Sequence, residues 1–161
     1  MATLSVTNIF NLSKATLVKF GALDWIAAAV ADAIANSESV GNRICGLYYL
    51  ESYCLQLKSG RVRGDIEPLV SQEKTGIVRV DAKFGFAQPA FQRGIVPARE
   101  AALENGICSL AIGGAHTCTS LGYFTEQIAK SNLIGIGFTN ASPIVAAPGG
   151  KTRIIGTNPI A

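Results

Sequence analysis

His116 is the one histidine among the 161 residues, and a run of small polar residues follows it. The stretch GGAHTCTSLGYF places it between an apolar segment and an amphipathic one. A histidine can transfer a proton near neutral pH. A loop that leaves a strand and enters a helix is also a favourable place to bind an anion. The residue types alone leave two interpretations open: a functional His116, or a polar loop whose hydroxyl groups cap the helix.

Two glycine-containing segments lie further along the chain. IGIGFTN has the spacing GxG, but no third glycine follows and the next residues do not open a helix, which excludes a Rossmann dinucleotide fingerprint. APGGKTR places two glycines before Lys151 and Arg153. This loop is either a cradle for a carboxylate or phosphate or a solvent-facing β-turn.

Composition indicates a globular protein with a substantial core, since 48% of the residues are hydrophobic and 16% are charged. The net charge of +3 is mild and no stripe of Lys or Arg is present, which argues against nucleic-acid binding. The most apolar run, WIAAAVADAIA, is shorter than the roughly 20 residues that span a bilayer. We therefore expect neither a nucleic-acid nor a membrane partner.

The cysteines lack CxxC spacing, and the start of the chain, MATLSVTNIFNLSK, carries no secretory signal. Both features are typical of reduced thiols in a cytoplasmic protein. One histidine and scattered cysteines also make a metal site improbable. The four cysteines are Cys45, Cys54, Cys108 and Cys118.

The elements that would position His116 are predicted from apolar periodicity. Helices are expected first, over residues 13–37 with a break at Gly21, and then over 45–58 with Gly60 as its C-terminal residue. The apolar second half of the first stretch is expected to be buried or to cover a partner. The remaining expected elements are a strand at 76–82, a helix at 88–105 interrupted or kinked at Gly94 and Pro97, a strand at 106–114, a helix at 121–132 and a strand at 134–140. Residues 153–159 are expected to begin either another strand or an extended loop.

This order predicts a mixed α/β fold, with helices first and then strands buried on both faces. The chain stops at Ala161, shortly after an apolar β segment begins. From this ending we expect the sequence to be part of a longer protein.

Several blocks occur together in one order from Cys45 onward: CGLYYLESYCLQLKSGRV, VDAKFGFAQPAF, ENGICSLAI, AHTCTSLGYF, NLIGIGFTN and PGGKTRIIGTNPIA. In these blocks the chain resembles the malate/L-lactate-type dehydrogenases of the non-Rossmann class. That family also includes ureidoglycolate dehydrogenases and Δ1-pyrroline-2-carboxylate/Δ1-piperideine-2-carboxylate reductases. GFAQPA and the terminal GTNP carry the resemblance most specifically.

The resemblance implies an oxidoreductase that uses NADPH or NADH on a small 2-oxo, 2-hydroxy or cyclic 2-imino acid, with a modest leaning toward the imino acid reductases. It also implies a homodimer. Residues 1–65 would form an N-terminal helical region, and 66–161 would form part of a non-Rossmann NAD(P)-binding αβ domain, truncated at its C-terminus. The family's acidic relay partner and the rest of its cofactor site would lie beyond residue 161.

The chain departs from the family at the proton donor. The family carries Ser-His-Gly followed three residues later by Arg, in which the His donates the proton and the Arg binds the substrate carboxylate. Alignment through Gly46 places Ile44 at the serine, Cys45 at the histidine and Tyr49 at the arginine. A thiol with an ordinary pKa of about 8.5 is a poor substitute for the histidine.

His116 aligns with the first residue of a His-His pair in the family, which makes it a catalytic candidate beside Cys45. Thr157 in GTNP matches a substrate-contacting threonine, and Tyr49 occupies the other substrate position. The family's cofactor-contacting turn maps onto Thr117, Cys118, Thr119, Ser120 and Leu121.

The sequence therefore predicts a truncated and inactive form of an NAD(P)H-dependent 2-imino or 2-oxo acid reductase. One alternative is a non-catalytic module that dimerises or pairs with a full-length relative. A weaker alternative is thiol chemistry at Cys45, which needs a lowered thiol pKa.

Overall fold

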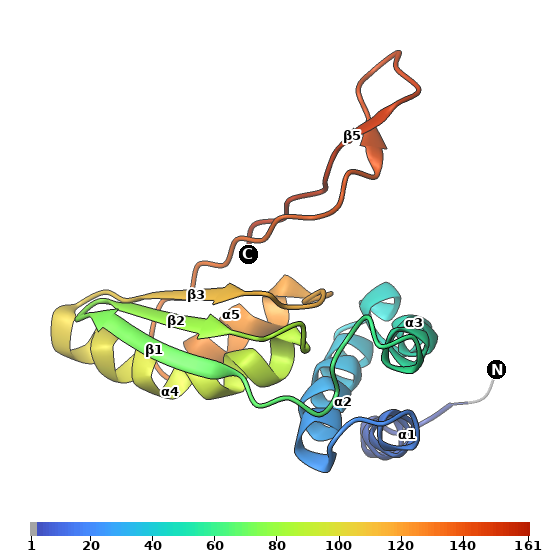
Figure 1. The fold of residues 1–161 in the computed structure, drawn as a ribbon, viewed down its shortest axis with the longest axis horizontal. Helices are drawn as coiled ribbons and strands as arrows, with labels where there is room; N and C mark the ends of the chain where they lie inside the picture. Colours follow the sequence, from blue (N-terminus) through green and yellow to red (C-terminus); the bar gives the residue numbers. More distant parts are fainter. Residues whose placement is uncertain (1–2) are drawn as a thin grey trace. The chain divides into compact units, whose positions relative to one another are not determined.

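The computed structural model describes residues 3–161 and begins with a helical region (Figure 1). Helix α1 spans Val6–Lys19 and α2 spans Asp24–Ser39, so the first helix starts earlier than residue 13, the expected start. Its start is fixed by Ser5, whose side chain accepts a hydrogen bond from the Asn8 N–H at 3.1 Å. Gly21, with φ of +99°, makes the expected break between the two helices.

A short 3-10 turn, η1 (Arg43–Cys45), leads into helix α3, which spans Leu47–Lys58. Gly60 has a φ of +72°, which confirms its expected role after the C-terminus of this helix. Among the helices formed by residues 3–161, none combines the length and the apolarity needed to cross a bilayer.

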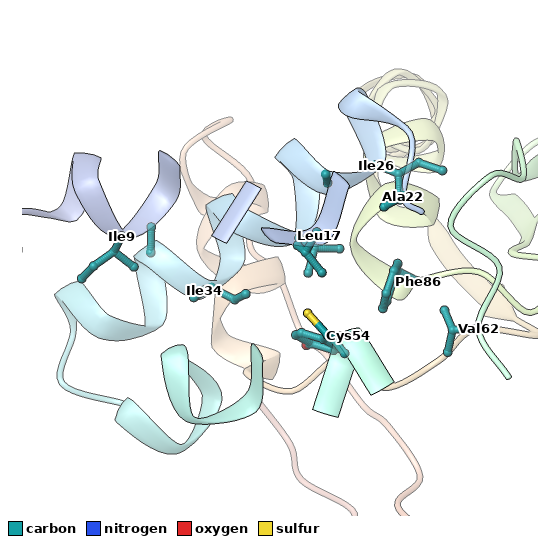
Figure 2. Packing of buried hydrophobic residues seen from close by; sticks show 12 residues of the cluster. Ile9, Leu17, Ala22, Ile26, Ile34, Cys54, Val62 and Phe86 are labelled. Atoms are coloured by element: carbon teal, nitrogen blue, oxygen red, sulfur yellow. The ribbon is translucent and has the colours of Figure 1, made fainter. Parts of the chain in front are cut away.

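Helix α2 forms the centre of the main hydrophobic core. Leu17 of α1, Ile26 and Ile34 of α2, and Cys54 of α3 belong to one buried cluster (Figure 2). The alanine-rich sequence lets the neighbouring helices approach α2 closely, and the expected burial of this helix is confirmed. Phe86 joins the same cluster and is 1% exposed, so the segment before the next helix is anchored on the helical core.

A three-stranded sheet follows, in the order β1-β2-β3. Strand β1 (Leu69–Lys74) pairs antiparallel with β2 (Ile77–Asp81), and β2 pairs parallel with β3 (Ser109–Gly113). Helix α4 (Ala87–Asn105) connects the two parallel strands and packs against one face of the sheet (Figure 1).

The expected burial of the strands on both faces is wrong for the part of the chain that the structure describes. Residues of β2 alternate between exposed and buried, with Val78 and Val80 buried, and β3 likewise exposes every second residue. The reason is that α4 covers one face of this sheet, and the alternating pattern is that of a half-buried strand.

Helix α4 is continuous across Gly94 and Pro97, so the expected interruption does not occur. Gly94 is buried against the sheet, where an added Cβ would lie 2.6 Å from Val80 Cγ2. Packing of this face onto the sheet offsets the hydrogen bond that Pro97 cannot donate.

Contacts divide the chain into a first compact unit that ends at Ser120 and a second from Leu121 to Ala161. The second unit contains helix α5 (Leu121–Ala129) and a two-stranded sheet of β4 (Val145–Ala146) and β5 (Arg153–Ile155). The strand expected at 134–140 is wrong, since that segment forms an isolated bridge between Phe138 and Ile160 and a few backbone hydrogen bonds to the last residues, but no regular strand. Pro148 and Gly149 form a turn, and Lys151 is exposed, which matches the β-turn alternative for APGGKTR.

Candidate active site

The carboxyl ends of the parallel strands β2 and β3 bring together the two loops that carry the candidate residues. The pairing continues past the strands as a parallel bridge between Phe86 and His116. The N–H of His116 donates to the carbonyl of Gly85 at 2.8 Å, and the N–H of Ala87 donates to the carbonyl of His116 at 3.2 Å. The backbone therefore fixes the position of His116.

The imidazole of His116 is half-buried among aromatic rings. Its centroid lies 6.4 Å from that of Tyr53 and 6.3 Å from that of Phe86. Burial and, to a lesser extent, the positive charge of Arg61 lower the pKa of His116. The imidazole is consequently neutral at neutral pH.

The Nε2 atom of His116 is buried and has no hydrogen-bond partner among the described residues. A buried polar atom without a partner costs about 1–3 kcal/mol. A ligand whose polar group reaches this atom would recover that free energy, so the imidazole is suited to bind one.

A ring of hydrogen bonds fixes the turn after His116. The hydroxyl of Tyr53 donates to Thr119 Oγ1 at 3.1 Å, and the Thr119 hydroxyl donates to the carbonyl of Cys118 at 2.7 Å. Gln88 Nε2 donates to the same Cys118 carbonyl at 3.2 Å and to Tyr53 Oη at 3.5 Å. Burial raises the pKa of Tyr53 well above its ordinary value, so its hydroxyl remains a donor at every physiological pH.

The other residues of the expected cofactor turn lie in the same loop. Thr117 Oγ1 accepts from the Thr119 N–H at 3.3 Å, and Ser120 Oγ accepts from Asn42 Nδ2 at 3.4 Å. Leu121 is the first residue of α5 and belongs to the second unit. Residues 117–120 are therefore gathered with His116, and their role in cofactor binding stays a prediction.

The residues at the family's proton-donor positions lie on η1 and at the start of α3. Ile44 is 70% exposed. Burial raises the pKa of the half-buried Cys45 thiol, although a hydrogen bond with Asn42 opposes the shift. Thiol chemistry needs a lowered pKa, so this alternative has no support. No hydrogen bond or ion pair joins Cys45 to His116 in the described part of the chain.

The two expected substrate positions fall in different units. The ring of Tyr49 packs edge-on against that of Tyr53 with centroids 5.2 Å apart, so it is linked to His116 through Tyr53. Thr157 follows β5 in the second unit and is exposed. Both substrate roles stay predictions.

Sequence reasoning missed Tyr53 and Gln88 as members of the site. Tyr53 enters the resemblance only within the block CGLYYLESYCLQLKSGRV, and Gln88 only within GFAQPA. A signal for Tyr53 was present, because it follows Tyr49 by one helical turn and therefore shares its face.

The sequence profile of the malate/L-lactate dehydrogenase family matches residues 4–161. The chain belongs to this family. The resemblance found in the sequence and the mixed α/β fold are both confirmed. Among the relatives, the (2R)-3-sulfolactate dehydrogenase (NADP(+)) of Chromohalobacter salexigens is 36% identical over 158 residues, which cover 98% of this chain and 47% of the relative. The Delta(1)-pyrroline-2-carboxylate reductase of Ancylobacter novellus is 34% identical, over 98% of this chain and 46% of the relative.

Solved structures of family members have the same fold. The delta1-piperideine-2-carboxylate reductase from Pseudomonas syringae superposes with a TM-score of 0.89 at 29% identity, over 99% of this chain and 48% of that one. The malate dehydrogenase from Pyrococcus horikoshii gives a TM-score of 0.91 at 28% identity, over 99% of this chain and 46% of that one. This chain thus spans about half the length of the relatives that it matches.

Proposed function

We propose that this chain carries the N-terminal half of an NAD(P)H-dependent oxidoreductase. Its substrate would be a 2-oxo acid or a cyclic 2-imino acid such as Δ1-piperideine-2-carboxylate or Δ1-pyrroline-2-carboxylate. Relatives named as Delta(1)-pyrroline-2-carboxylate reductase and (2R)-3-sulfolactate dehydrogenase support this chemical class. The observation that carries the proposal is the buried and unpaired Nε2 of His116, whose pKa burial lowers, beside a turn of hydroxyl residues.

The turn after His116 fits a cofactor. A nicotinamide cofactor supplies a hydride when it is bound. Thr117 and Ser120 would hold it through their hydroxyl groups, and Cys118 and Thr119 through their backbone. His116 Nε2 would find its missing partner on a bound polar group. An uncharged imidazole accepts or donates a hydrogen bond there without adding a positive charge.

We further propose that the chain in its 161-residue form does not turn substrate over. Ile44 offers no hydrogen-bonding group, and Tyr49 has no positive charge to bind a carboxylate. The raised pKa of Cys45 makes its thiol a weak proton donor near neutral pH, where a donor works best with a pKa close to the ambient pH. Cofactor binding without reduction is the expected behaviour.

Cofactor binding is tested by fluorescence titration of the purified chain with NADPH and with NADH. Thr117→Val keeps the shape of the side chain but removes its hydroxyl, and it is expected to weaken binding several-fold. Thr16→Val is the matched control, because the Thr16 hydroxyl donates only to the Leu12 carbonyl of its own helix. Equal affinities of the two variants would contradict the placement of the cofactor at this turn.

A second proposal is that the helical region mediates homodimerisation. Exposed large apolar side chains occur on α1 and α3, namely Val6, Leu12, Val18 and Leu55, and they support a partner surface. Light scattering on the chain at low and high salt tests this, and a monomer at both would contradict it.

The four free cysteines fit a reducing compartment, so we place the protein in the cytoplasm, to be checked by cell fractionation.

A further inference from the structure

Thr119 adopts a backbone conformation that a β-branched residue rarely takes. Its φ is +56°, in the left-handed region that favours glycine. It lies in the turn after His116, at the centre of the residues proposed to hold the cofactor. Something other than the intrinsic preference of threonine must therefore keep the turn in this shape.

The side chain of Thr119 is held by α3, far away in the sequence. Its hydroxyl accepts from Tyr53 at 3.1 Å and donates to the Cys118 carbonyl at 2.7 Å. Gln88, which is 1% exposed, donates both to that carbonyl at 3.2 Å and to Tyr53 Oη at 3.5 Å. The bonds close a ring, and members of such a ring strengthen one another in a water-poor site.

We propose that Tyr53 is a positioning residue for the candidate active site: its hydroxyl, oriented by Gln88, holds Thr119 in the left-handed conformation and thereby sets the turn beside His116. This inference rests on the proposed function only in assigning cofactor binding to the turn. The positioning of the turn by Tyr53 does not require a cofactor.

Packing alone does not account for the arrangement. Tyr53 is 1% exposed, and its ring contacts Phe86 with centroids 5.4 Å apart, a contact that phenylalanine would make equally well. The hydroxyl adds nothing to that contact, and without Thr119 and Gln88 it would be a buried group with no partner. Its presence is therefore explained by the turn that it holds.

The single histidine of the chain gives a direct readout, because its imidazole signal in an NMR titration is unambiguous. Tyr53→Phe is expected to release the turn, expose His116 to water and raise its pKa toward the ordinary value. Thr119→Val removes the same bond from the other side and is expected to act alike, which covers the case in which one variant fails to fold. Tyr48→Phe is the matched control, because Tyr48 lies on the same helix but is 78% exposed.

Thr119→Gly separates positioning from general stability. Glycine tolerates a positive φ, so the turn no longer depends on Tyr53. The double variant Tyr53→Phe with Thr119→Gly is therefore expected to return the His116 titration toward that of the unmodified chain. An unchanged titration in Tyr53→Phe, or an equal shift in the single and double variants, would overturn the proposal.

An NADPH titration of the same variants distinguishes this inference from the proposed function. Tyr53→Phe is expected to weaken NADPH binding several-fold, and Thr119→Gly in the same chain is expected to restore it. If the unmodified chain binds no NADPH, the proposed function fails, while the His116 titration still decides whether Tyr53 positions the turn.

Discussion

His116 occupies an environment in which its protonated form is disfavoured. Burial is the main cause, and the charge of Arg61 adds to it. The aromatic rings of Tyr53 and Phe86 supply part of the apolar surroundings. The folded chain therefore binds a proton at His116 less readily than the unfolded chain does.

This difference predicts a pH dependence of stability. The contribution of a neutral His116 is fully present above the ordinary histidine pKa of about 6.5, and it is lost as the pH falls through that value toward the lower pKa of the folded state. Urea denaturation at about pH 7.5 and about pH 5 is expected to show a larger loss of unfolding free energy for the unmodified chain than for His116→Gln. Carboxyl groups titrate in both chains, so only the difference reports on His116. Equal losses would contradict the lowered pKa.

The grouping of His116 with the hydroxyl residues of the following turn could be predicted from residue types, whereas the hydrogen bonds of Tyr53 and Gln88 to that turn could not. The single histidine and its hydroxyl neighbours are adjacent in the sequence, so their grouping is visible there. The bond from Tyr53 to Thr119 joins residues 66 positions apart, and that from Gln88 to Tyr53 spans 35. Which tyrosine is buried beside a turn depends on how α3 packs, and this is set by tertiary contacts that local patterns do not contain.

At the scale of elements, the site depends on the unit β2-α4-β3. The parallel strands end at Asp81 and Gly113, and α4 begins with Ala87 directly after the first loop. Gly94 allows α4 to approach the sheet, because an added Cβ would lie 2.6 Å from Val80 Cγ2 and 2.7 Å from Leu110 Cδ1. The same helix carries Gln88, so its seating on the sheet also places the amide that orients Tyr53.

Gly94→Ala is expected to destabilise the fold by about 1–3 kcal/mol, because the added methyl group overpacks the contact between helix and sheet. Gln92→Ala, on the same helix but exposed, is the control and is expected to change stability by less than about 0.5 kcal/mol. The free energies come from urea denaturation followed by circular dichroism. Similar values for the two variants would contradict the close packing at Gly94.

Helices and apolar strands followed from the sequence better than the polar strand β1 did. Ile77–Asp81 alternates in hydrophobicity and was recognised, whereas β1, LVSQEK, is polar over most of its length and gave no strand signal. The opposite error occurred at 134–140, where apolar residues alternate with glycine but have no partner strand in the described part of the chain beyond one bridge. A strand needs a neighbour, and periodicity does not reveal whether one is present.

At the scale of the whole molecule, the chain supplies about half the length of its relatives, 47% of the sulfolactate dehydrogenase. Several apolar side chains of the second unit are exposed, such as Ile134 at 94% and Phe138 at 71%. The chain therefore contains the part of the proposed oxidoreductase site that includes His116. The resemblance implies that the acidic partner lies beyond residue 161.

Restoring the family's residues is therefore not expected to restore activity in this chain. The triple variant Ile44→Ser, Cys45→His and Tyr49→Arg is expected to remain inactive in the 161-residue form, because the acidic partner is not among these residues. Spectrophotometric assays of NADPH oxidation with Δ1-piperideine-2-carboxylate and with 2-oxo acids measure this, and circular dichroism verifies that the variant is folded. Measurable reduction would show that the replaced residues alone limit activity.

The central claim is a cofactor site that persists without turnover, and one measurement tests it directly. The unmodified chain is titrated with NADPH and NADH by fluorescence, and Δ1-piperideine-2-carboxylate, Δ1-pyrroline-2-carboxylate or 2-oxo acids are then added while NADPH oxidation is followed. We predict saturable cofactor binding and no oxidation with any of these acids. Oxidation of NADPH, or the absence of binding at millimolar cofactor, would contradict the account.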